Sequence, residues 1–200
     1  MNAGRLIAFE GVDGAGKSTQ LRRLAGVLRA GGHTVVETHE PSDGPWGRRI
    51  REMARSGARV VPEEELRWFV EDRREHVAQV LRPGVASGAL VLTDRYFLST
   101  VAYQGARGLD PARLLAEAEA EFPLPDLALV LDLDPGAGLA RVAARGAVAE
   151  PAFEDGAFLA GVAERFRALD RPYLEHVDAS VSVDRVAAAI RAIVRSRLGL

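Results

Sequence analysis

The chain has 200 residues, of which 48% are hydrophobic and 27% are charged, and its formal net charge is −2. These values are typical of a single soluble globular domain, which we expect over residues 1–200, and they argue against a generally basic nucleic-acid or anionic-membrane binder. Without cysteine, the chain can form neither a disulfide framework nor a thiolate metal site.

The N-terminal segment MNAGRLIAFE carries a charge at position 5 and lacks the long apolar core of a signal peptide. No apolar run in the sequence approaches the ~20 residues that a membrane span requires. We therefore expect a cytoplasmic protein that has neither a membrane nor a nucleic acid among its partners.

Short apolar runs alternate with longer helical patterns along the chain. The pattern predicts strands at 5–9, 34–38, 89–93 and 127–133. It predicts helices at about 17–30, 46–56, 63–82, 135–144, 156–171 and 183–197. Because the strands are almost entirely apolar and alternate with helices, we expect an α/β fold whose parallel sheet is covered by helices on both faces.

The segment GVDGAGKS at residues 11–18 fits the phosphate-loop pattern G-x-x-x-x-G-K-[ST] between a predicted strand and a predicted helix. Its glycines allow successive backbone N–H groups to converge on phosphate oxygens, and the helix N-terminus adds positive potential. Lys17, the single lysine of the chain, would neutralise charge on the transferring phosphoryl group, and the Ser18 hydroxyl would hold Mg²⁺. The predicted triphosphate-binding residues are Gly11, Val12, Asp13, Gly14, Ala15, Gly16, Lys17, Ser18 and Thr19.

A phosphate loop is shared by GTPases, motor ATPases and small-molecule kinases, so it does not define the reaction. The only lysine belongs to the loop, so the chain cannot contain an Asn-Lys-x-Asp guanine-reading motif, and it is too short for most motor ATPases. A small kinase is the hypothesis that remains.

Two further segments suggest where a second substrate binds. Asp94 and Arg95 follow a predicted buried strand, and ligands of open α/β sheets bind outside the carboxyl ends of strands. Asp94 is placed to act on Mg²⁺, directly or through water, and Arg95 to bind an acceptor phosphate. Phe69 and Arg73 are four residues apart on one helical face, where a ring and a guanidinium suit a nucleobase, although an aromatic residue on a helix is more often part of the core.

The segments FEGVDGAGKST, EDRREHV, LTDRYFLSTVAYQG and VDAS, in this order and spacing, resemble the thymidylate kinase family of P-loop nucleoside monophosphate kinases. The resemblance covers nearly the whole chain. It implies a P-loop NTPase-type five-stranded parallel sheet with helices on both faces and a short lid, and it implies a homodimer. It also implies that the γ-phosphoryl group of ATP is transferred, with Mg²⁺, to dTMP, which yields dTDP and ADP.

The same resemblance implies roles for residues that match the family's motifs. Asp13 would accept a hydrogen bond from the deoxyribose 3′-hydroxyl, and Tyr103 would crowd the 2′ position. The other dTMP-binding residues would be Phe69 and Arg73 at thymine, Arg51 and Arg95 at the monophosphate, and Ser99 and Gln104 at the base. Lys17, Asp94 and Arg95 would be catalytic, with Ser18 and Asp94 at the metal.

Two segments depart from the family pattern. The loop EPSDGPWG at residues 40–47 has Ser42 and Asp43 where the family has glycines, so we expect it to follow another path. The phosphate loop has Gly14 where one class of the family has an arginine, and the lid, at about 141–158, has a Glu150-Pro151 pair where an acidic–arginine pair is common.

The missing arginine requires another source for the cation that stabilises the transition state. We expect Arg145, together with Arg141, to supply it, the alternative being that both are solvated helix charges. Glu154 resembles a lid acid that assists this arrangement. Two other functions remain open: a kinase for another nucleoside monophosphate or a nucleoside, and a nucleotide-binding module that has lost transfer activity.

Overall fold

The computed structural model describes residues 4–58, 60–144 and 155–200, in which strands and helices alternate as the sequence predicts. The strands are β1 (Arg5–Glu10), β2 (Val35–His39), β3 (Leu90–Asp94), β4 (Leu127–Asp132) and β5 (Leu174–Asp178). The α-helices are α1 (Lys17–Ala30), α2 (Pro45–Ser56), α3 (Pro62–His76), α4 (Arg82–Ala86), α5 (Phe97–Ala106), α6 (Pro111–Glu121), α7 (Pro135–Ala144), α8 (Gly156–Arg167) and α9 (Val183–Leu198).

The five strands form one parallel sheet in the order β2-β3-β1-β4-β5, which confirms the predicted fold class. The central strands β1, β3 and β4 are almost completely buried, as their apolar sequences require. Because β1 lies between β3 and β4, the loops that follow these three strands meet at one edge of the sheet. Phe9 pairs in register with Asp94, which brings the phosphate loop next to the end of β3.

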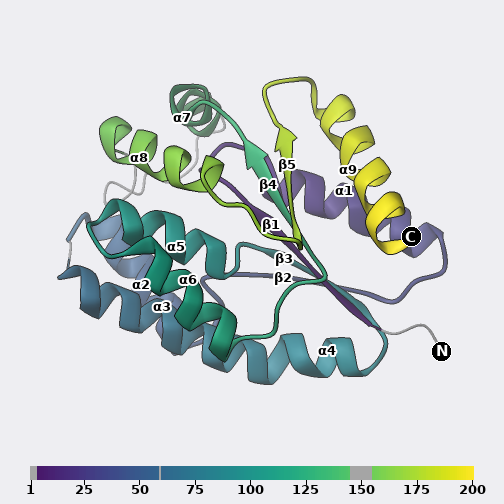
Figure 1. Ribbon diagram of the computed structural model, residues 1–200, viewed down its shortest axis with the longest axis horizontal. Helices are drawn as coiled ribbons and strands as arrows, with labels where there is room; N and C mark the ends of the chain where they lie inside the picture. The colour runs from purple at the N-terminus through teal and green to yellow at the C-terminus, as the bar shows by residue number, and fades with distance from the viewer. Residues whose placement is uncertain (1–3, 59, 145–154) are drawn as a thin grey trace.

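Helices cover both faces of the sheet (Figure 1). Helices α1 and α9 contact each other on one face, while α3 to α6 lie on the other, where α8 packs against α5 and β4. None of the helices in the described part of the chain is both long and apolar enough to cross a membrane. The sheet is therefore enclosed on both faces. A ligand is expected to bind where the carboxyl ends of the strands meet.

Three elements were not located by the sequence pattern. Helix α5 is buried along nearly its whole length, so its sequence lacks the polar face that produces a helical period. Strand β5 is an edge strand with exposed positions, and its sequence LEHVD is not the apolar run that identified the other strands. The sequence of helix α6 does contain a helix-start signal. Asp110 caps the helix by accepting a hydrogen bond from the N–H of Ala112, and Pro111 lies in the first turn.

The helix predicted over 63–82 is divided. Helix α3 ends at His76, a π-helical segment η1 (Val77–Leu81) follows, and α4 then continues to Ala86. Pro83 lies in the first turn of α4 and has no N–H to donate to the preceding turn, so the backbone widens there. Pro83 is therefore the physical reason for the division.

Candidate active site

The phosphate loop runs from the carboxyl end of β1 to α1, which begins at Lys17. Gly14 has a φ of 79° and Gly16 a φ of 97°, conformations that side-chain-bearing residues adopt only with strain. A Cβ atom on Gly14 would lie 2.2 Å from the carbonyl oxygen of Gly138 in α7. An arginine at position 14 therefore does not fit this backbone.

Lys17 is almost completely buried beside the loop. Its Nζ donates to the carbonyl oxygen of Val12 at 3.0 Å and lies 3.9 Å from Oδ1 of Asp13. Burial and the charge of Arg95 lower the pKa of Lys17, while the carboxylates of Asp13 and Asp94 oppose that shift. The ammonium group is thus held in a fixed position against the loop.

The two predicted Mg²⁺ ligands are in direct contact. Ser18, in the first turn of α1, donates a hydrogen bond from Oγ to Oδ2 of Asp94 at the end of β3. In the described part of the chain no group of three or more His, Cys, Asp and Glu side chains could hold a metal. One hydroxyl and one carboxylate fit Mg²⁺, which takes few protein ligands and keeps water and phosphate oxygens.

Arg95 connects the phosphate loop to the neighbouring pocket. It is the only described non-glycine residue with a positive φ, 73°, and such a conformation is costly for a bulky residue. Its guanidinium donates to the carbonyl oxygen of Gly11 at 3.1 Å, to Oγ of Ser99 at 3.0 Å, to Oδ1 of Asp13 at 2.7 Å and to the hydroxyl of Tyr103 at 3.2 Å. Burial alone would raise the pKa of Asp13, but Arg95 and Lys17 outweigh it and lower that pKa to about 2.

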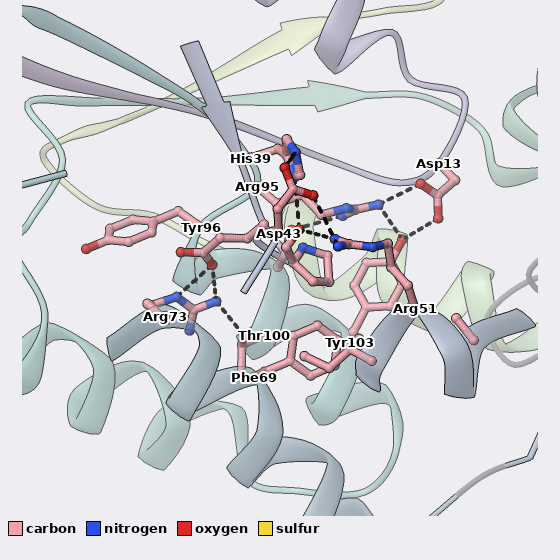
Figure 2. A pocket seen from close by; sticks show the side chains of 15 residues that line it. Asp13, His39, Asp43, Arg51, Phe69, Arg73, Arg95, Tyr96, Thr100 and Tyr103 are labelled. Atoms are coloured by element: carbon pink, nitrogen blue, oxygen red, sulfur yellow. Dashed lines mark hydrogen bonds and ion pairs between the residues drawn. The ribbon is translucent and has the colours of Figure 1, made fainter. Parts of the chain in front are cut away.

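A cavity of about 350 Å³ lies next to the phosphate loop and brings together residues from β2, α2, α3 and α5. Figure 2 shows Arg73 on one side of this cavity and Arg51 and Arg95 on the other. Of the residues predicted to bind dTMP, seven line it: Asp13, Arg51, Phe69, Arg73, Arg95, Ser99 and Tyr103. The structure therefore brings together side chains that are far apart in the sequence.

Arg73 is held in place by a buried ion pair that the sequence did not predict. Its Nε and Nη2 donate to Oε2 of Glu40 at 2.9 and 2.7 Å, and Nη2 also donates to Oγ1 of Thr100 at 2.9 Å (Figure 2). Oε1 of Glu40 lies 3.0 Å from Nδ1 of His76, whose Nε2 lies 2.7 Å from Oγ1 of Thr38. Burial would raise the pKa of Glu40, but Arg73 and His76 lower it. Glu40 therefore stays charged and orients Arg73 at the wall of the pocket.

The divergent loop at 40–47 is fixed by its own serine. The N–H and hydroxyl of Ser42 donate to the buried carboxylate of Asp72 at 2.7 and 2.6 Å. The peptide bond between Glu40 and Pro41 is cis. Nη1 of Arg51 donates to the carbonyl oxygens of Pro41 and Ser42 at 2.7 and 2.8 Å, so the loop also positions this arginine.

Two of the residues predicted at the base have other partners as well. Ser99 donates to Oε2 of the buried Glu10, the last residue of β1, which also accepts from the N–H of Tyr96 at 3.0 Å. Burial raises the pKa of Glu10 to about 7, although Ser99 and Arg95 oppose this shift. Gln104 does not line the cavity: it is fully buried, and its Nε2 donates to Oε1 of Glu65 at 2.9 Å.

The lid is described only at its ends. Arg141, on α7, donates from Nη1 to the carbonyl oxygen of Ala179 at 3.1 Å, which links α7 to the turn after β5. Arg145, Glu150 and Glu154 lie outside the described residues.

The comparisons with known proteins agree with one another. The family model described as thymidylate kinase matches residues 9–190. A thymidylate kinase of Xanthomonas euvesicatoria pv. vesicatoria (strain 85-10) is 48% identical, with 98% of this chain and 85% of that protein covered. The thymidylate kinases of Desulfotalea psychrophila and Akkermansia muciniphila are each 43% identical, with 92% and 97% of this chain and 91% and 93% of those proteins covered.

Proposed function

The chain belongs to the thymidylate kinase family, and we propose that it transfers the γ-phosphoryl group of ATP to dTMP, which yields dTDP and ADP. The observation that carries this proposal is the position of Arg95, which contacts the phosphate loop at Gly11 and lines the same cavity as Phe69 and Arg73. A phosphate held by Arg95 lies next to the loop that binds the donor. The arrangement suits an in-line transfer in which positioning and charge neutralisation do most of the work.

The residues of the phosphate loop hold the donor. Backbone N–H groups between Gly11 and Ser18 bind the phosphates of ATP, and Lys17 neutralises charge on the group that is transferred. Ser18 and Asp94 would hold Mg²⁺, which would supply positive charge that neutralises the phosphate oxygens of ATP. Thr19, half-buried in the first turn of α1, completes this set.

The residues of the cavity hold the acceptor. Phe69 stacks on thymine, and Arg73 donates to a base carbonyl through Nη1, for which no hydrogen bond is found within the described residues. Arg51 and Arg95 bind the monophosphate, Asp13 accepts from the 3′-hydroxyl and Tyr103 crowds the 2′ position. Ser99, at the cavity wall, and Gln104, behind it, support the base side of the pocket.

The lid supplies the remaining cation. Gly14 cannot be replaced by arginine in this backbone, and Arg145 with Arg141 takes that role. An arginine at the transition state contributes roughly 10³–10⁵ in rate, so Arg145→Ala is expected to lower kcat by orders of magnitude. A change within a factor of two would overturn the assignment.

A coupled assay with ATP and Mg²⁺ tests the proposed reaction. Turnover of dTMP is expected well above that of dUMP, dCMP and dGMP, and chelation of Mg²⁺ is expected to abolish it. Tight nucleotide binding without turnover would instead indicate a binding module. A homodimer, which the resemblance implies, and a cytoplasmic location, which the sequence composition led us to expect, both stay predictions. Light scattering with a mass of about twice 21.5 kDa would support the homodimer.

A further inference from the structure

Asp43 places a carboxylate at the pocket from within the divergent loop. It lines the cavity together with Arg51 and Arg95, and its Oδ1 lies 3.2 Å from Nη2 of Arg51 (Figure 2). The Asp43 side chain is 87% exposed, whereas that of Arg51 is 25% exposed. A carboxylate and a phosphate bind to a guanidinium through the same hydrogen-bonding edge.

The hydrogen bonds of Arg51 allow its Nη2 to exchange one anionic partner for another. Nη1 is fixed by the carbonyl oxygens of Pro41 and Ser42, and Ser42 is itself fixed by Asp72. The guanidinium therefore stays in place when Nη2 exchanges one anion for another.

The other carboxylate–arginine pair of the pocket differs in this respect. Asp13 accepts from Arg95 at 2.7 Å and from the hydroxyl of Tyr103 at 3.3 Å, and it lies 3.9 Å from Nζ of Lys17. The opposite charges around Asp13 hold it in the site. The side chain of Asp43 is much more exposed: its Oδ1 lies 3.2 Å from Nη2 of Arg51, and its Oδ2 lies 3.7 Å from Nε2 of His39.

We propose that the carboxylate of Asp43 competes with the acceptor phosphate for Arg51. The carboxylate occupies Nη2 of Arg51 until the phosphate of dTMP displaces it. This inference rests on the proposed binding of that phosphate by Arg51. After displacement the carboxylate stays close to an incoming dianion, so it weakens the affinity for dTMP both by competition and by repulsion. It does not touch the transferring group, so it affects KM rather than kcat.

Asp43→Asn tests the proposal because it keeps the size of the side chain and removes its charge. The KM and the calorimetric Kd for dTMP are expected to fall about three- to tenfold at low ionic strength, with kcat within a factor of two. The difference should narrow at high salt, which screens an exposed charge. Thymidine, which lacks the phosphate, should inhibit the variant and the wild type with the same Ki.

Asp184→Asn is the matched control, because Asp184 is 85% exposed and pairs with Arg23 at 2.6 Å on the α1–α9 face. It removes the same charge and should leave the affinity for dTMP unchanged. Arg51→Gln tests whether Arg51 binds the phosphate of dTMP at all. If this variant leaves the KM for dTMP unchanged, the phosphate binds elsewhere, and both the proposed role of Arg51 and the inference about Asp43 are wrong. If it raises KM while Asp43→Asn lowers neither KM nor Kd, or lowers the Ki of thymidine equally, only the inference about Asp43 is overturned.

Discussion

Tyr103 illustrates how one side chain can combine positioning with selection. Its hydroxyl donates to Asp13 and accepts from Arg95, while its ring lines the cavity and lies edge-on to Phe158 and Phe166. Tyr103→Ala should open space for a 2′-hydroxyl and lower the preference for dTMP over the ribonucleotide by roughly tenfold in kcat/KM. Tyr103→Phe keeps the ring and should retain the preference. An unchanged preference in the alanine variant would show that the ring does not exclude ribonucleotides.

In the proposed Mg²⁺ site, Asp94 is the residue whose charge we expect to matter most for metal binding. Asp94→Asn removes the carboxylate that accepts the hydrogen bond of Ser18, so the concentration of Mg²⁺ for half-maximal activity should rise about tenfold or more. A titration with Mg²⁺ at saturating ATP and dTMP measures this. Asp132→Asn is the control, since Asp132 ends β4 at the same edge of the sheet but pairs with His176 at 2.9 Å. An equal rise in both variants would contradict a specific metal role for Asp94.

The buried cluster of Glu40, Arg73 and His76 connects the end of strand β2 to helix α3. The side chains of the Glu40–Arg73 ion pair are at most 3% exposed. Glu40→Gln leaves Arg73 buried without its counter-charge, which typically costs about 3–5 kcal/mol. At about 2–4 °C per kcal/mol for a chain of this size, the melting temperature should fall by roughly 6–20 °C.

Glu37→Gln on β2 is the matched control for Glu40→Gln. Glu37 forms a more exposed ion pair with Arg29, and such pairs contribute about 0–1 kcal/mol. The melting temperature of the Glu37→Gln variant should therefore differ from that of the wild type by no more than about 4 °C. Similar losses in the two variants, measured by thermal unfolding, would mean that the cluster around Glu40 adds no special stability.

The elements that the sequence predicted share a simple physical origin. Strands β1, β3 and β4 are buried on both sides, so their apolar runs are visible without a structure. The phosphate loop is equally visible, because its glycines and lysine occupy fixed positions between a strand and a helix. Helix α5 and strand β5 were missed because a fully buried helix and an edge strand lack these periodic signals.

The site was predicted less completely than the loop. Glu40 and Asp72 orient Arg73 and Ser42, yet each is a single polar residue whose partner lies about 30 positions away. Only the tertiary structure brings such partners together, so neither spacing nor periodicity can identify them. The departure at Ser42 was visible in the sequence, but its consequence, a bond to Asp72, was not.

Over the whole molecule, buried carboxylates give stability a dependence on pH that changes sign. The pKa of Glu40 is lowered, so its contribution is present above the pKa of the unfolded chain, near 4.5, and is lost as the pH falls further. The pKa of Glu10 is raised to about 7. Its contribution is present below about 4.5 and is lost as the pH rises to about 7, because the unfolded chain ionises while the folded one keeps its proton.

Glu10→Gln should remove the second of these effects, since glutamine has nearly the same shape but does not titrate. Between pH 5 and pH 8 the stability of the variant relative to the wild type should increase by on the order of 1–3 kcal/mol, measured by urea unfolding at both pH values. Glu117→Gln alters a side chain that is 61% exposed and should show no such trend. A difference between Glu10→Gln and the wild type that stays constant with pH would mean that Glu10 ionises normally in the folded protein, and that Ser99 and the N–H of Tyr96 bind an ordinary carboxylate.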